Sequence, residues 1–140
     1  MTAQSLIHAS CVAMDGRGVL LLGNSGCGKS DVALRLIDAG AVLVGDDQIG
    51  ISNVNGTLVA TPAPRLEGMI EARGVGILEI AFVRDIPLVL AVKLVERTNI
   101  ERMPEPVFFG CAGLELPLVS LHAFDGSTVA KIRMILARYA

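Results

Sequence analysis

The residues best placed for chemistry form a glycine-rich run near the N-terminus. The run reads Gly23-Asn24-Ser25-Gly26-Cys27-Gly28-Lys29-Ser30. Each position fits the phosphate-binding loop pattern G-x-x-x-x-G-K-[ST]. Glycines let the backbone turn tightly, so that successive N–H groups and the start of the next helix point at phosphate oxygens. Lys29 adds a mobile positive charge, and the hydroxyl of Ser30 can ligate the Mg²⁺ that accompanies ATP. The run therefore predicts a nucleoside triphosphate site.

The segments on both sides of this loop have the order that the motif requires. Residues 18–22 are continuously apolar and predict a buried strand. Residues 31–38 predict an amphipathic helix, with Val32 and Leu36 on its apolar face and Gly40 in position to end it. A glycine-rich turn that binds nothing is the alternative, but it does not require a strand before it and a helix after it.

Two adjacent carboxylates follow the next apolar segment, residues 41–45. Asp46 and Asp47 stand at the end of this predicted strand. Phosphoryl transfer needs a carboxylate near the metal and a base for the attacking hydroxyl. Neighbouring side chains of an extended strand point in different directions, so one aspartate can support the metal while the other accepts the proton. The alternative is a solvated Asp-Asp turn.

A single histidine is expected beside the loop. Asp15-Gly16 predicts a two-residue hairpin between residues 6–14 and 18–22. In that register Met14 opposes Arg17, and His8 opposes Gly23. His8 is therefore expected at the mouth of the phosphate loop, with a packing role as the alternative.

The rest of the chain predicts a strand-rich α/β domain. Asn55-Gly56 is a strong hairpin signal. The other expected elements are a short helix over about 65–70, strands over 76–83 and 88–95, an irregular region over 98–117, and a helix from Asp125 or Ser127 to Tyr139.

Composition limits the classes of protein that the chain can represent. Its 140 residues suit one domain, residues 1–140. A net charge of -2 and a pI near 5.6 disfavour nucleic acid as a partner. The longest apolar run, residues 86–92, is too short to cross a membrane, and the N-terminus does not resemble a secretion signal, so we expect a cytoplasmic address. The three scattered cysteines favour reduced thiols, with Cys27 open to oxidation among the phosphate-facing amides.

Together these motifs resemble the catalytic domain of the HPr kinase/phosphorylase family, bacterial enzymes that phosphorylate a serine of a phosphotransferase-system carrier. The matching elements are His8, the loop 23–30, the pair Asp46-Asp47 and the block Glu71-Ala72-Arg73-Gly74-Val75-Gly76-Ile77, which is similar to the family's L-E-[IV]-R-G-L-G-I motif. The resemblance implies a P-loop-containing mixed sheet like the C-terminal nucleotide-binding core of phosphoenolpyruvate carboxykinase. It also implies ATP and Mg²⁺ as cofactors, HPr or an HPr-like carrier as partner, and a homo-oligomer.

The resemblance assigns roles to individual residues. Lys29 holds the β and γ phosphates, Ser30 and Glu71 ligate magnesium, and Asp46 supports the metal. Asp47 is the general base, with His8 beside it. Arg102 matches the family arginine that approaches the reacting phosphate, and Arg73 and Arg97 are competitors for that role.

The chain also departs from the family's longer members. It begins shortly before His8, so we expect the short form without an additional N-terminal domain. The family's late P-[VI]-[RK]-P-G-R-N segment, which is tied to dephosphorylation by phosphorolysis, has no clear counterpart in residues 118–125. We therefore expect kinase activity, with phosphorolysis slow or absent.

Two other functions fit the phosphate loop. A small-metabolite kinase usually needs a basic lid, and the only late arginine cluster is Arg97 and Arg102. A non-catalytic nucleotide-sensing module is the other alternative, and such a binder does not need the base Asp47.

Overall fold

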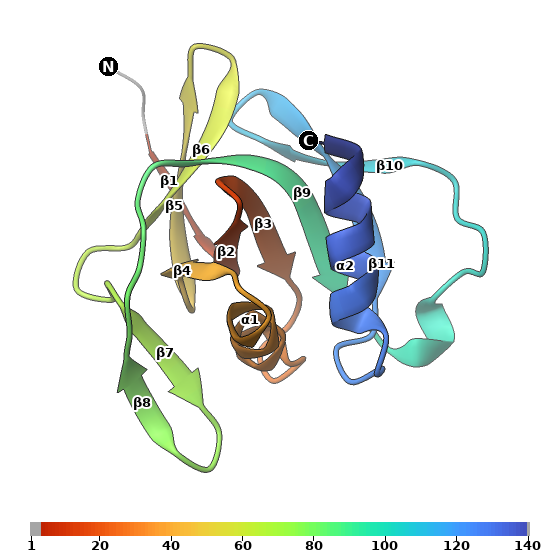
Figure 1. Ribbon diagram of the computed structural model, residues 1–140. Helices are drawn as coiled ribbons and strands as arrows, with labels where there is room; N and C mark the ends of the chain where they lie inside the picture. Colours follow the sequence, from red (N-terminus) through yellow and green to blue (C-terminus); the bar gives the residue numbers. More distant parts are fainter. Residues whose placement is uncertain (1–3, 140) are drawn as a thin grey trace.

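The strands form one large mixed sheet and one separate hairpin (Figure 1). The structure is a computed structural model that describes residues 4–139. The nine-stranded sheet has the order β1-β5-β6-β9-β3-β2-β4, and β11 joins it through β9 and carries β10. Its strands are β1 Ser5–His8, β2 Ser10–Met14, β3 Arg17–Leu22, β4 Val42–Gly45, β5 Gln48–Val54, β6 Thr57–Pro62, β9 Ile86–Leu94, β10 Val107–Cys111 and β11 Leu114–Leu121. The hairpin consists of β7 Met69–Ala72 and β8 Gly76–Glu79.

Strand β9 organises the sheet because it pairs with different strands along its length. Its start pairs antiparallel with β6, and its later part pairs in parallel with β3 on one side and β11 on the other. The parallel strands β3, β9 and β11 therefore end at the same edge of the sheet. In α/β sheets, ligands bind beyond the carboxyl ends of parallel strands. The loop that follows β3 and the loop that follows β11 both lie at this edge.

The two faces of the sheet carry two different hydrophobic cores. Helices α1, Lys29–Asp38, and α2, Thr128–Leu136, pack on one face, where Val19, Leu21 and Leu90 meet Leu36 and Ile132. Short 3₁₀ turns lie at Arg97–Asn99 (η1) and Ala137–Tyr139 (η2). Strands β1, β5 and β6 curl over the other face, whose buried residues include the small side chains Ala9, Cys11, Ala13, Ala60 and Ala91. Small side chains allow this close approach of the two parts of the sheet.

Helix α1 ends where its sequence predicts and begins at Lys29, two residues before the predicted start. Its apolar residues Val32, Ala33 and Leu36 are buried. The helix ends in a Schellman arrangement, in which the Ala41 N–H bonds to the Leu36 carbonyl and the Gly40 N–H to the Ile37 carbonyl. Gly40 has φ 111°, a conformation that glycine adopts without a Cβ clash. The predicted end of the helix at Gly40 is confirmed.

The hairpin register is correct for β2 and β3 but does not reach His8. Met14 pairs with Arg17 and Ser10 with Leu21, as predicted. The strand is interrupted at Ala9. The preceding strand, β1, pairs with β5 instead of β3, so that His8 opposes Gln48 rather than Gly23. The predicted pairing of His8 with Gly23 is therefore wrong. Two-residue turns at Asp15-Gly16 and Asn55-Gly56 are confirmed, and all four residues have positive φ.

Two other predicted elements are also wrong. Residues 65–70 form turns that lead into β7, and Arg65 has φ 72°, which an α-helix does not accommodate. The region 98–117, predicted to be irregular, is irregular over 100–106 but contains β10 and the start of β11. Pro117 obscured this strand, but β11 pairs with β9 only from Leu118 onward, so the missing proline N–H interrupts no pairing on that side.

Candidate active site

The glycine-rich run forms a tight loop between β3 and α1, closed around the side chain of Lys29. The Lys29 ammonium donates to the carbonyls of Gly23, at 2.8 Å, and Asn24, at 3.1 Å. Gly23, Gly26 and Gly28 all have positive φ. A Cβ on Gly28 would lie 2.6 Å from the Cβ of Ala123, so only glycine fits there. Lys29 is 7% exposed, and its charge is therefore held at the loop rather than in bulk solvent.

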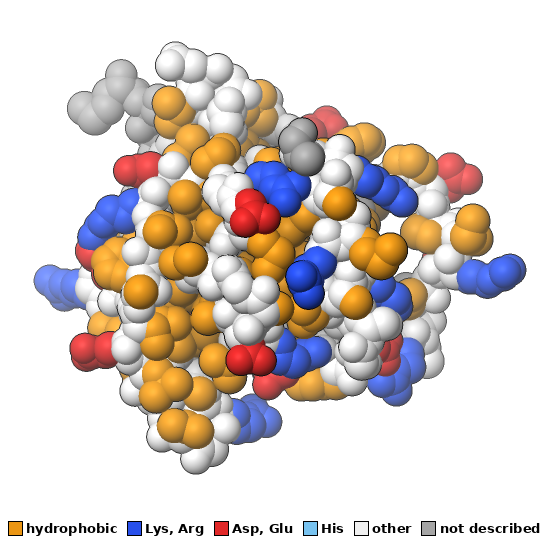
Figure 2. All heavy atoms as spheres, viewed as in Figure 1, with side chains coloured by type: hydrophobic (Ala, Val, Ile, Leu, Met, Phe, Trp, Pro, Cys, Tyr) orange, Lys and Arg blue, Asp and Glu red, His pale blue; other side chains and the backbone are white. Residues whose placement is uncertain are grey.

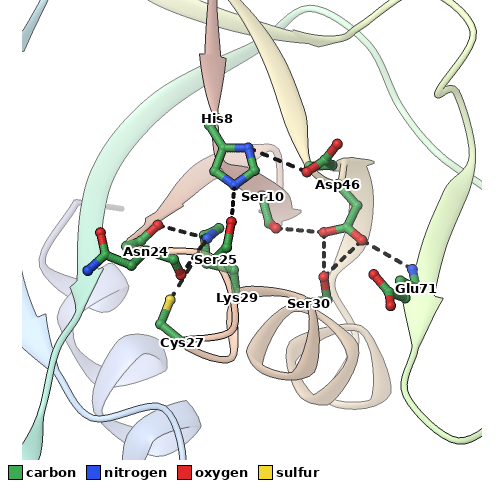
Figure 3. Close-up of polar contacts among 11 residues, drawn as sticks. His8, Ser10, Asn24, Ser25, Cys27, Lys29, Ser30, Asp46 and Glu71 are labelled. Atoms are coloured by element: carbon green, nitrogen blue, oxygen red, sulfur yellow. Dashed lines mark hydrogen bonds and ion pairs between the residues drawn. The ribbon is translucent and has the colours of Figure 1, made fainter.

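Asp46 is the centre of a buried hydrogen-bond network (Figure 3). Ser10 Oγ donates to Asp46 Oδ1 at 2.6 Å, and Ser30 Oγ lies 2.8 and 2.9 Å from the two carboxylate oxygens. The Glu71 backbone N–H donates to Oδ2 at 3.1 Å. Asp46 is 6% exposed, so its charge is compensated by these donors from β2, α1 and β7. The network joins the first turn of α1 to the separate hairpin.

Asp47 lies in a different environment although it is the next residue. Its φ is 72°, and the Gln48 N–H bonds to the Asp46 carbonyl across it, which is the i to i+2 bond of a γ-turn. Its side chain is 64% exposed, and Oδ1 lies 3.4 Å from His8 Nδ1. The other ring nitrogen of His8 lies 3.5 Å from Ser25 Oγ in the phosphate loop. The γ-turn separates the directions of the two carboxylates, and His8 stands between Asp47 and the loop.

The β7–β8 hairpin forms a further wall of the site. Glu71 pairs with Ile77 and Ala72 with Gly76, so the block 71–77 is a hairpin whose turn carries Arg73. Figure 3 shows the Glu71 carboxylate on the side of β7 that faces Ser30. Val75 and Ile77 of this hairpin are exposed apolar residues, of which Val75 also lines the cleft, and Figure 2 shows apolar side chains gathered over the hairpin.

These elements enclose a cleft of about 400 Å³. Its charged lining consists of four carboxylates, Asp31, Asp46, Asp47 and Glu71, against Lys29 and Arg73. Within residues 4–139, His, Cys, Asp and Glu side chains do not gather in threes as a metal cage. Mg²⁺ is usually held by one or two carboxylates together with phosphate oxygens and waters, so the oxygen donors of Ser30, Asp46 and Glu71 fit this ion.

The structure brings most of the predicted residues together but not all of them. His8, the loop 23–30, Asp46-Asp47 and Glu71 surround the cleft. Arg102 instead lies in the exposed segment between η1 and β10 and does not line the cleft, whereas its competitor Arg73 does. Arg97 is ion-paired with Asp125.

Two residues of the site were missed from the sequence. Ser10 begins an apolar strand, and its sequence neighbours do not indicate that its hydroxyl has a polar partner. Phe124 lines the cleft from the loop after β11, but its neighbours in the sequence form no motif that predicts a ligand site.

The three cysteines differ in their surroundings. Burial raises the pKa of the Cys11 thiol far above its usual range, and burial also raises the pKa of Cys111. Cys27 is half-buried in the loop, with Sγ 3.9 Å from the Lys29 ammonium. Cys11 is therefore an inert packing residue.

The fold and the cleft define a mixed α/β protein in which a strand, a glycine loop and a helix face two carboxylates of opposite exposure. The family model described as "HPr Serine kinase C-terminal domain" matches residues 1–132. The chain belongs to this family, which confirms the resemblance seen in its motifs.

Individual relatives agree with this assignment. A Chlorobium limicola protein named HPr kinase/phosphorylase is 36% identical over 143 residues, covering 93% of this chain and 43% of that protein. A Clostridium tetani protein of the same name is 35% identical over 95 residues, covering 68% of this chain and 31% of that protein. The solved structure of the Hpr(Ser) kinase/phosphatase from Coxiella burnetii superposes with a TM-score of 0.82 at 25% identity, covering 96% of this chain and 89% of that one.

The chain thus spans less than half the length of these two curated relatives, but nearly all of the solved domain. A helix long and apolar enough to cross a membrane is not found among residues 4–139.

Proposed function

We propose that this protein is an ATP-dependent serine kinase that phosphorylates HPr or an HPr-like carrier of the phosphotransferase system. One observation carries the proposal: the Ser30–Asp46 hydrogen bond of the phosphate loop lies in the same cleft as the exposed Asp47–His8 pair. A nucleotide-binding module needs the first feature alone. A kinase needs both, because a base must reach the hydroxyl that attacks the γ-phosphate.

Each residue of the cleft has a separate role in the proposed phosphoryl transfer. The loop amides and the Lys29 ammonium bind the β and γ phosphates and stabilise their charge. Asp47 takes the proton of the carrier serine as its oxygen bonds to the γ-phosphorus and ADP leaves. His8, 3.4 Å from Asp47 and 3.5 Å from Ser25, orients this carboxylate relative to the loop. We assign the approach to the reacting phosphate to Arg73, which lines the cleft, ahead of the sequence candidate Arg102.

Magnesium is the cofactor that the oxygen donors favour. Ser30 and Glu71 would hold it, with Asp46 keeping the Ser30 hydroxyl oriented through their hydrogen bond. When bound, the ion neutralises charge that develops on the phosphate oxygens. The cleft holds four carboxylates and two cationic side chains, so a divalent cation would offset their excess negative charge.

The test is transfer of labelled phosphate from ATP to a purified carrier in the presence of Mg²⁺. Wild type should label a carrier serine. Lys29→Ala should lose both ATP binding and transfer. Asp47→Asn should keep ATP binding but lose transfer, because only the base is removed. Tight ATP binding by wild type without any transfer would instead identify a nucleotide-sensing module.

The reverse reaction is expected to be weak. Residues 118–125 form the end of β11 and the following loop, and they show no clear counterpart of the family's P-[VI]-[RK]-P-G-R-N segment, which is tied to phosphorolysis. We expect slow or absent pyrophosphate release from phosphoserine carrier and inorganic phosphate. Robust release by wild type would contradict this expectation.

We further propose that residues 1–140 form one catalytic domain whose sheet matches the P-loop nucleotide-binding core of phosphoenolpyruvate carboxykinase. Both hydrophobic cores share a single sheet, which supports one folding unit. We propose that the protein acts in the cytoplasm, where ATP is available, and that it forms a homo-oligomer. Light scattering after size-exclusion chromatography measures the oligomeric state, and a monomer at all concentrations would contradict that last proposal.

A further inference from the structure

The aromatic ring of Phe124 stands exposed at the rim of the phosphate cleft. Phe124 is 59% exposed and lines the cleft together with Gly28, Lys29 and Ser30. A Cβ on Gly28 would lie only 2.9 Å from Phe124 Cζ, so the ring adjoins the last glycine of the phosphate loop. Exposure of a phenylalanine ring to water is unfavourable. A ring that is fixed at a ligand site can bury this surface against a flat apolar partner.

The backbone that carries this ring is fixed on both sides. The carbonyl of Ala123, the preceding residue, accepts a hydrogen bond from the Arg35 guanidinium of α1. Asp125, the following residue, accepts a hydrogen bond from Arg97 Nε at 2.8 Å. His122 packs edge-to-face against Phe124, with ring centroids 6.0 Å apart, and its Nδ1 lies 3.0 Å from the Val95 carbonyl. The ring therefore stands on a braced loop rather than on a mobile one.

The topology places this loop at the same edge of the sheet as the phosphate loop. Phosphates bound by the loop after β3 lie at the carboxyl edge of the parallel strands β3, β9 and β11. Phe124 follows β11 at that same edge and adjoins Gly28 at the N-terminal end of α1, whereas His8 lies beside Ser25, earlier in the loop, and Asp47 lies beside His8. One end of a bound nucleotide thus faces the carboxylates and the other end faces the ring.

We propose that Phe124 is the stacking platform for the nucleobase of the nucleotide whose phosphates the loop 23–30 binds. This inference rests on the proposed function. The ring binds a purine by face-to-face stacking, an interaction that tolerates different bases and adds affinity to the phosphate contacts. A ligand with phosphates but no base, such as tripolyphosphate, gains nothing from it.

The first test compares ATP with tripolyphosphate by calorimetry in the presence of Mg²⁺. Phe124→Ala should weaken ATP binding by roughly tenfold and leave tripolyphosphate affinity unchanged. Phe108 provides a matched control, because it is 57% exposed on β10 but does not line the cleft. Phe108→Ala should bind both ligands as wild type does.

The second test uses the absence of tryptophan from the sequence. Phe124→Trp introduces a single tryptophan on the platform, and its emission, excited selectively over that of Tyr139, should be quenched by ATP but not by tripolyphosphate. Phe108→Trp should not respond to either ligand. This spectroscopic signal reports stacking directly and does not depend on kinase activity.

The outcomes separate this inference from the proposed function. Wild-type binding of tripolyphosphate together with unchanged ATP affinity in Phe124→Ala would overturn the stacking platform and leave the phosphate site intact. Equal loss of both ligands in Phe124→Ala would also overturn it, because the ring would then support the loop rather than the base. Failure of wild type to bind either ligand would refute the proposed function and the platform together.

Discussion

The two walls of the cleft place neighbouring aspartates in opposite environments. Asp46 is buried and receives hydrogen bonds from Ser10, Ser30 and the Glu71 N–H, so its charge is compensated inside the fold. Asp47 is exposed, lies in a γ-turn with positive φ, and has only His8 as an ionic neighbour among the described residues. A buried and bonded carboxylate stabilises the arrangement of elements around it. An exposed carboxylate is free to exchange a proton with a substrate.

This contrast predicts that the two residues fail in different ways when they are replaced. Loss of Asp46 should affect folding and metal support, while loss of Asp47 should affect chemistry alone. The variants below test that division.

The largest expected effect is on the rate of the Asp47→Asn variant. Asparagine, like aspartate, tolerates positive φ, so the γ-turn is preserved while the base is lost. We expect kcat to fall by about 10²- to 10⁴-fold, the usual contribution of a general base. The midpoint of urea unfolding should not change. A shifted midpoint with an unchanged kcat would reverse the roles of the two aspartates.

The next effect is on the stability of the Asp46→Ala variant. Removing the carboxylate leaves the fully buried Ser10 hydroxyl without its acceptor and disconnects Glu71 from α1. We expect the free energy of unfolding to fall by about 2 kcal/mol, measured by urea denaturation. Asp47→Asn is the matched control. Equal stability of the two variants would show that the network around Asp46 contributes nothing to the fold.

A smaller effect is expected from Ser10→Ala, which removes one donor and keeps the Asp46 charge. Ser30 and the Glu71 N–H still bond the carboxylate, so the free energy of unfolding should fall by only about 1 kcal/mol. The same measurement on Ser25→Ala, which deletes a hydroxyl at the exposed rim, should give a value near wild type. A larger loss of unfolding free energy for Ser25→Ala than for Ser10→Ala would contradict the contrast between the buried surroundings of Asp46 and the exposed surroundings of Asp47.

The smallest effect concerns Asp125, a partly buried carboxylate that pairs with Arg97 at the surface. Its hydrogen bond with Arg97 lowers the pKa of Asp125 below the ordinary value of 3.8. Because the folded pKa is depressed, this stabilisation is present above pH 3.8 and is lost as pH falls through the folded pKa. Asp125→Asn should therefore have a slightly lower Tm than wild type at pH 7, and the difference should fade below about pH 4. A constant difference in Tm down to pH 3 would exclude the ion pair as its cause.

Features set by short stretches of chain were predictable. The phosphate loop, helix α1 with its end at Gly40, and the turns at Asp15-Gly16 and Asn55-Gly56 all follow from local backbone preferences. The predicted helix over 65–70 was wrong because the local preference of the sequence was overridden there. Arg65 adopts a left-handed conformation that an arginine rarely takes. The aspartate pair was recognised as chemical, although its division into a buried and an exposed member was not visible.

The sequence by itself determined that the chain carries a loop with the phosphate-binding pattern, two adjacent carboxylates and a histidine, because residue types and local spacing are visible in it directly. Only the tertiary structure decided how they meet. His8 reaches the cleft through pairing with β5, Ser10 bonds to Asp46 across the β2–β4 contact, and Phe124 arrives from the far end of β11. Each of these placements joins residues distant along the chain. Such contacts depend on which strands pair, and no local backbone preference fixes that choice.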